Sequence, residues 1–227
     1  MERHFDDMVQ KLNTNLLQMA ALTEKAIYNS VEALKTLNRD LAESTIQEDQ
    51  SIDELENVIE EEGINLLALF QPLATDLRFI TTAMRISTDL ERIADLAVNI
   101  CQRARELVKN PPVLQKPMAR IPALAEIAQK MVKESIDAFV RRDLELARQV
   151  IFADKSANQL RTAIIHELVY EHMAVDGGVA PRAVPLLLVA RDLERICDQA
   201  TDIAQETIYM VEAIIVKHHP ERLRPLP

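Results

Sequence analysis

The sequence DLERIADLAVNI occupies residues 89–100, and DLERICDQATDI occupies residues 192–203. Corresponding positions in the two stretches lie 103 residues apart. Each stretch sets an acid, an Asp and then an Asn or Asp at i, i+4 and i+8. On an α-helix this spacing places the three oxygen-bearing side chains along one face. The chain is therefore expected to contain two copies of a helix that carries a polar stripe, formed by Glu91, Asp95 and Asn99 in the first copy and by Glu194, Asp198 and Asp202 in the second.

The composition around these stretches favours an all-α fold. Hydrophobic residues make up 48% of the 227 residues and charged residues 27%, which is typical of a folded globular chain. Only three Gly and no Trp are present, which leaves little material for β-hairpin turns. The length is sufficient to bury a sizeable core.

Apolar residues recur at three- and four-residue steps and predict six long helices. The first three are expected near residues 6–37, 41–70 and 75–109, with a break at Gln71-Pro72 and Thr75 as a helix cap. A proline-rich stretch at 111–122 then predicts a linker between two halves. Three further helices are expected near 123–140 and 144–173 and, after a turn at 176–178, up to about residue 218.

The chain is thus predicted to form two pseudo-symmetric three-helix bundles, at residues 1–110 and 123–219, with a frayed tail at 220–227. The stretch from Asp49 repeats from Asp154 at an offset of 105 residues, close to the offset of the DLER stretches. The two bundles can each have a separate core or share one long core.

The second and third helices of the first half carry acids that should face each other. In an antiparallel hairpin, residues at one level have numbers with a constant sum, and the pairs Asp53–Glu91 and Asp49–Asp95 meet this condition. Four converging carboxylates repel one another unless a cation neutralises them. Oxygen ligands favour Mg²⁺, Ca²⁺ or Mn²⁺ and also allow iron, while zinc is less favoured without His or Cys. Two further acids, Glu56 and Glu60, continue the stripe.

The same arithmetic in the second half pairs Asn158 with Glu194 and Asp154 with Asp198. Asn158 removes one negative charge, and Arg161 lies about one turn further along the same helix. We therefore expect the first site to hold a metal ion more tightly than the second, and Asn158→Asp to strengthen the second. Two other interpretations stay open, a carboxylate-bridged metal enzyme and a metal-free helical scaffold whose acids are solvated.

The formal net charge of −10 argues against nucleic acid as the main partner, because a phosphate backbone requires a basic surface. No apolar run approaches a membrane span, and the first residues lack a signal-peptide core, so a cytoplasmic protein is expected, reaching membranes only through partners. Cys101 and Cys197 show no paired framework and are expected to be buried, reduced thiols.

Taken together, these motifs resemble the PhoU family, which regulates phosphate transport and phosphate signalling in bacteria. The resemblance covers essentially the whole chain and rests on the acid-xxx-Asp pairs and on the stretch QPLATDLR at residues 71–78. This stretch is close to the family turn QPxAxDLR, whose defining positions are here Gln71, Pro72, Asp76 and Arg78.

The resemblance implies a non-enzymatic negative regulator built from two three-helix bundles, with metal clusters on its acidic faces. It also implies a homodimer and two kinds of partner, the ATPase subunit of the phosphate ABC transporter and the phosphate sensor histidine kinase. The implied metals are divalent or trivalent ions such as Mg, Mn, Fe or Zn. Arg78, Arg92 and Arg195 border the acidic faces, and we expect them to pair with neighbouring carboxylates.

Overall fold

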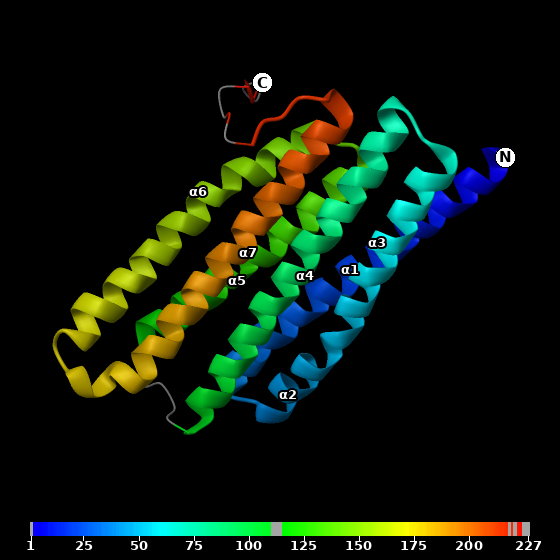
Figure 1. The fold of residues 1–227 in the computed structure, drawn as a ribbon. Coiled ribbons are helices and arrows are strands. Elements are labelled where there is room, and N and C mark those ends of the chain that lie inside the picture. The colour runs from blue at the N-terminus through cyan, green and yellow to red at the C-terminus, as the bar shows by residue number, and fades with distance from the viewer. Residues whose placement is uncertain (1, 110–114, 218, 220–221, 224–227) are drawn as a thin grey trace.

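The computed structural model describes residues 2–109, 115–217, 219 and 222–223. Six long helical rods run nearly side by side in two units of three (Figure 1). The first unit contains α1 (Glu2–Thr36), α2 (Arg39–Glu48), α3 (Gln50–Phe70) and α4 (Ala74–Lys109). The second contains α5 (Gln115–Arg141), α6 (Leu144–His166) with a π-helix (Glu167–Met173), a short 3₁₀ turn (Gly177–Val179) and α7 (Ala180–Glu212). The predicted all-α fold of two three-helix bundles is confirmed.

The predicted second helix is divided at Asp49 into α2 and α3, although Asp49 itself has helical backbone angles. The amides of Ile52 and Asp53 still donate to the carbonyl of Asp49, at 2.8 and 3.2 Å. α2 and α3 therefore form one nearly continuous helix, which is the middle helix of the first bundle.

The turn that starts the middle helix is the same in both units. Leu37 has a positive φ of 51° and Arg142 one of 53°, and each is followed by a helix cap. The Asn38 side chain accepts from the Leu41 amide, and the Asp143 side chain accepts from two amides of the first turn of α6. A short polar side chain at the N-cap satisfies amides that have no partner within the helix. The repeat visible in the DLER stretches thus extends to the turns.

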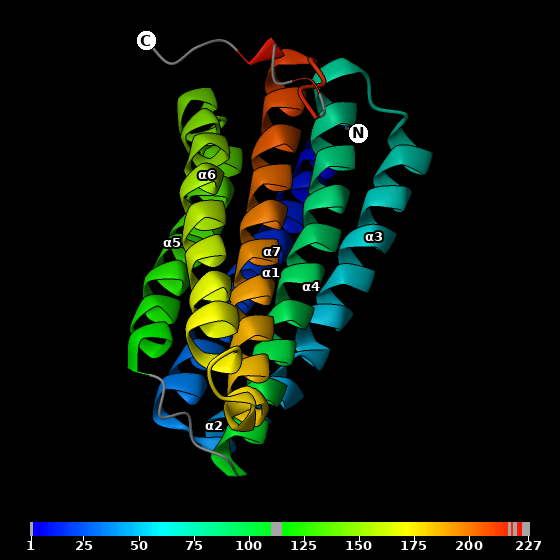
Figure 2. The same ribbon diagram turned by 90° about the vertical axis from the view of Figure 1, so that its left-hand side faces the viewer.

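The two bundles share one core, which decides between the two arrangements that the sequence left open. α4 and α7 pack against each other along the middle of the molecule in both views (Figures 1 and 2). Ile93 and Ile196, one from each DLER stretch, are fully buried in a single hydrophobic cluster. The rings of Phe79 and Phe139 stack with centroids 5.6 Å apart, so α4 of the first unit also contacts α5 of the second.

The α3–α4 hairpin turns tightly at the stretch beginning with Gln71. Gln71 adopts the left-handed conformation and its amide donates to the Leu67 carbonyl at 3.2 Å, which closes the end of α3. α4 then begins at Ala74, one residue before Thr75, so the predicted capping role of Thr75 is wrong. Gly63 lets the two arms approach closely, because a Cβ at this position would lie 2.5 Å from the sulfur of Met84.

The predicted linker is too long. α5 begins at Gln115, eight residues before the predicted start of its helix, and residues 110–114 lie outside the described part of the chain. Pro117 lies in the first turn, where an amide hydrogen is not needed for the helix. Pro122 removes one helical hydrogen bond, but its neighbours Ile121 and Leu124 are buried in the core, so packing keeps the helix intact.

The last helix is shorter than predicted and ends at Glu212, because Ala213 has a left-handed φ of 58°. The chain then turns back and buries Val216. Most of the predicted frayed tail falls on residues outside the described part of the chain. Within the described residues, no helix combines the length and apolar character needed to cross a membrane.

Candidate metal-binding faces

The first acidic face lies between α3 and α4, as the hairpin arithmetic predicts. Burial raises the pKa of Glu91 most, and together with the negative charges of Asp95, Glu56, Asp53 and Asp49, in that order, it brings the pKa to about 7. Carboxylates from both arms of the hairpin are therefore close enough to repel one another. Each of these residues was a candidate ligand in the sequence.

Asp49, the N-cap residue of α3, is a half-buried acid of this face. Burial, followed by the charges of Asp53 and Asp95, raises its pKa to about 6. Its Oδ1 atom is buried and has no hydrogen-bond partner. A buried carboxylate oxygen without a donor is costly, and a cation would satisfy it. The donor set on this face therefore fits a hard metal ion.

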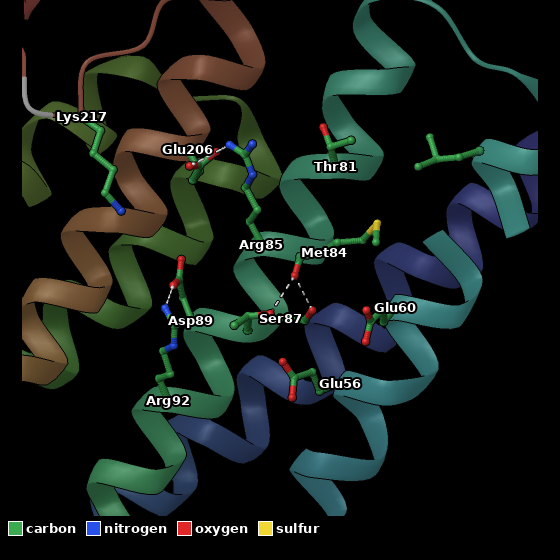
Figure 3. A pocket seen from close by; sticks show the side chains of 12 residues that line it. Glu56, Glu60, Thr81, Met84, Arg85, Ser87, Asp89, Arg92, Glu206 and Lys217 are labelled. Carbon is green, nitrogen blue, oxygen red and sulfur yellow. Dashed lines mark hydrogen bonds and ion pairs between the residues drawn. The ribbon is translucent and has the colours of Figure 1, made fainter. Parts of the chain in front are cut away.

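The remaining candidate ligands of this face differ in how exposed their side chains are and in where they lie along the two helices. Asp53 and Asp95 are exposed to solvent, whereas Asn99 is half-buried two turns beyond Glu91 on α4. Figure 3 shows Glu56 and Glu60 pointing from α3 toward α4, where both line a groove of about 590 Å³. The charge of Glu56 also raises the pKa of Glu91, so the acidic stripe continues from the first face into this groove.

The side chains of the first face do not converge on one point. Among the described residues, no group of three or more His, Cys, Asp or Glu side chains is arranged to hold a metal ion. Mutual repulsion keeps carboxylates apart when no cation lies between them. Rotation of exposed side chains such as Asp53 and Asp95 would be needed to enclose an ion.

The second face, between α6 and α7, already contains a positive charge. The Arg161 guanidinium contacts the Glu194 carboxylate at 2.9 Å, and the Asn158 amide donates to the Asp154 carboxylate at 2.8 Å. Burial and the charges of Glu194 and Asp154 raise the pKa of Asp198 to about 6, while Arg161 lowers it. Arg161 thus supplies one positive charge to this face, although the buried Oδ1 atom of Asp154 still has no hydrogen-bond partner. A metal ion bound there would have to displace Arg161 from Glu194.

Asp202, the last candidate ligand on α7, has neighbours that the sequence does not predict. It forms an ion pair with Lys217 at 3.0 Å, and it is the strongest charge acting on Asp89 of α4. Asp89 is 8% exposed, and burial followed by the charge of Asp202 raises its pKa to about 7. Sequence reasoning missed this pair between the two units, although Asp89 opens the DLER stretch and recurs as Asp192.

The three arginines near the acidic faces have different partners. Arg92 contacts the Asp89 carboxylate at 3.6 Å, as expected (Figure 3). Arg195 lowers the pKa of Asp192, which burial raises. Arg78 does not follow the expectation, because its Nε atom donates to the backbone carbonyl of Met210 at 3.0 Å. This contact ties the start of α4 to the end of α7, where helical carbonyls lack intrahelical partners.

Comparison with known proteins identifies the family of this fold. The family model described as "PhoU domain" matches residues 16–104 and again residues 121–207. A "Phosphate-specific transport system accessory protein PhoU homolog" of Aquifex aeolicus is 39% identical over 92% of this chain and 94% of that protein. The homologue of the same description from Clostridium acetobutylicum is 35% identical over 91% of this chain and 94% of its own length.

A solved structure agrees with the sequence relatives. The crystal structure of PhoU from Pseudomonas aeruginosa is 33% identical and superposes with a TM-score of 0.89, covering 92% of this chain and all of that chain. The duplicated acidic hairpin, the QPLATDLR turn and the shared core thus occur in a chain that matches the family over nearly its whole length. The chain belongs to the PhoU family.

Proposed function

We propose that this protein is a non-enzymatic regulator of the phosphate-specific transport system that binds metal on its first acidic face. Its relatives are named as accessory proteins of that system. The proposal includes the two partners that the family resemblance implies, the transporter ATPase subunit and the phosphate sensor histidine kinase. It also includes the cytoplasmic location, the homodimeric state and the inhibitory direction of the regulation.

One observation carries the metal-binding part of the proposal. The first face combines a buried, unpartnered Asp49 oxygen with the raised pKa values of Asp49 and Glu91. These features describe a carboxylate cluster without a counter-ion, and a hard cation such as Mg²⁺ or Mn²⁺ is the group that would relieve both. On the second face Arg161 already supplies a positive charge, so we propose that metal binds there more weakly than on the first face.

The shape of the molecule suits the docking part of the proposal. Long helices offer extended surfaces for partner domains, and the acidic face presents negative charge on one such surface. A metal ion held there could be completed by a ligand from the partner, or a basic patch of the partner could meet the carboxylates directly.

The metal assignment is tested with the double variant Asp53→Ala/Glu91→Ala. Bound metal is measured by mass spectrometry in the purified wild-type protein and in the variant, with Glu54→Ala/Glu61→Ala on exposed positions of α3 as the control. We expect the first pair of substitutions to abolish bound metal and the control pair to retain it. Equal metal content in all three proteins would exclude the assignment.

The regulatory role is tested separately in cells. A deletion strain should express phosphate-starvation genes in phosphate-rich medium, and the wild-type gene should restore repression. A tagged wild-type protein isolated from phosphate-replete cells should carry transporter and kinase subunits with it. Intact repression in the deletion strain would refute the regulatory role without bearing on metal binding.

A further inference from the structure

A second groove lies at the opposite end of the molecule from the α3–α4 turn, where α2 begins, α4 ends and α7 begins (Figure 1). Its volume is about 580 Å³. Three basic side chains line it, Arg39 from α2 with Arg105 and Lys109 from α4, together with the Gln102 amide. Glu106 is the one acid in its lining among the described residues. A basic groove is notable in a chain whose net charge is −10.

The ion pairs around the groove leave a net positive charge inside it. Glu106 is already engaged by Arg103 at 2.9 Å. Arg105 forms an ion pair with Glu43 through its Nε atom at 3.0 Å, which leaves its two terminal nitrogens for another acceptor. Within the described part of the chain, neither Arg39 nor Lys109 forms an ion pair or a hydrogen bond.

Helix electrostatics explain one of these unpaired cations but leave the other unexplained. Lys109 is the last residue of α4, where a cation is favourable because the helix C-terminus is partially negative. Arg39 is the first residue of α2, where a cation opposes the positive end of the helix. Arg39 therefore stands at a locally unfavourable position and faces a groove that already contains positive charge.

Comparison of the two repeats shows that this charge is not a property of the fold. The equivalents of the groove residues Arg105 and Lys109, 103 residues further along the chain, are Ile208 and Glu212. Glu206 lines the groove near the first acidic face, at the related crossing of α4 and α7 (Figure 3). The same structural position is thus acidic at one end of the α4–α7 pair and basic at the other.

We propose that the basic groove binds an anion through its phosphate groups, with Arg39, Arg105 and Lys109 as the contacting side chains. Arginine donates paired hydrogen bonds to phosphate oxygens, and lysine supplies a further point charge. The groove has the volume of a small-molecule site, which suits a di- or triphosphate chain as well as a single phosphate. The start of α7, lining the groove through Pro181, adds the positive end of a long helix.

The groove is independent of the metal-binding proposal, because none of its lining residues belongs to the acidic faces. Inorganic phosphate, pyrophosphate and ATP are therefore titrated separately into the full-length protein by calorimetry, in low-salt buffer with EDTA to exclude metal-mediated binding. The phosphate source is identified as the one that binds most tightly. At least one of the three should show saturable binding.

The variant Arg39→Gln/Lys109→Gln tests the assigned side chains. Its matched control is Lys130→Gln/Arg141→Gln, which removes the same charge from exposed positions of α5 whose ion pairs are long, at 3.7 and 3.6 Å. Loss of charge-assisted contacts should raise the Kd at least about tenfold in the groove variant and less than about twofold in the control. Thermal unfolding verifies that both variants remain folded. Absence of saturable binding by wild-type protein, or equal weakening in both variants, would overturn the proposal.

Discussion

Glu91→Gln should make the metal-free protein more stable at neutral pH, although it removes a candidate functional side chain. The pKa of Glu91 rises from an ordinary 4.5 to about 7 in the folded protein. A carboxyl group whose folded pKa is raised binds its proton more tightly in the folded state than in the unfolded state. The contribution of Glu91 to the free energy of unfolding is therefore largest below its unfolded pKa of about 4.5. This contribution falls as the pH rises toward the folded pKa of about 7, and it is constant above that pH.

The size of the effect follows from the same pKa values. A change from 4.5 to about 7 corresponds to about 3 kcal/mol if it is converted in full. Glu91 is only partly buried and its neighbours Asp53 and Asp95 are exposed, so water screens the repulsion substantially. We therefore expect Glu91→Gln to raise the free energy of unfolding by about 1 kcal/mol at neutral pH.

Urea denaturation in the presence of EDTA measures this difference at about pH 7.5 and about pH 4. At the lower pH, Glu91 is protonated and the variant should match the wild type. Glu61→Gln, at an exposed position of α3 outside the acidic face, is the control and should change stability little at either pH. A variant that is less stable than the wild type at neutral pH would refute the repulsive character of this face.

Three further outcomes follow from particular contacts. The double variant Arg161→Met/Asn158→Asp should bind Mn²⁺ on the second face with an affinity measurable by calorimetry, because it lacks the arginine that pairs with Glu194. Mn²⁺ binding no tighter than in the wild-type protein would contradict the role of Arg161 as an internal cation. Arg120→Met leaves the 3%-exposed Glu167 side chain without its partner and should lower the free energy of unfolding at neutral pH by about 3 kcal/mol. Adding Glu167→Gln should recover part of that loss in urea denaturation, and a loss below about 1 kcal/mol for Arg120→Met would be inconsistent with an enclosed ion pair. Burial raises the pKa of Cys101 to about 12. Native protein at about pH 8 should therefore react with a thiol reagent far more slowly than urea-unfolded protein. Fast reaction of the native protein would contradict the burial of this thiol.

The features that the sequence predicts well are those that depend on helical periodicity. The positions of Asp49 and Asp53 opposite Glu91 and Asp95 follow from a short turn and a constant rise per residue, and both conditions hold in the structure. Arg161 was noted as weakening the second face because its distance from Asn158 along the helix is also a matter of spacing.

Other features depend on tertiary packing and leave little trace in the sequence. Pro122 was interpreted as part of a linker because proline disfavours helix interiors, yet burial of its neighbours in the core outweighs that preference. The proximity of Asp89 to Asp202 of the other unit depends on how α4 crosses α7, which the spacing along either helix does not show. The same holds for Arg78, because its partner, the Met210 carbonyl, lacks an intrahelical donor only where α7 ends, two residues later at Glu212.

The equivalent helices α4 and α7 contact each other as two identical helices do across the axis of a two-fold symmetric dimer. The charge of Glu206 acts on Asp89, and the charge of Arg103, the equivalent of Glu206, acts on Asp192, so each unit presents the same two regions to the other. In such an isologous contact, one surface is complementary to itself. A gene encoding a single three-helix unit could therefore have formed this architecture by self-association before duplication joined two copies. Because the two units are joined in one chain, their contact regions need not stay identical, and the grooves at the two ends of the α4–α7 pair carry opposite charge.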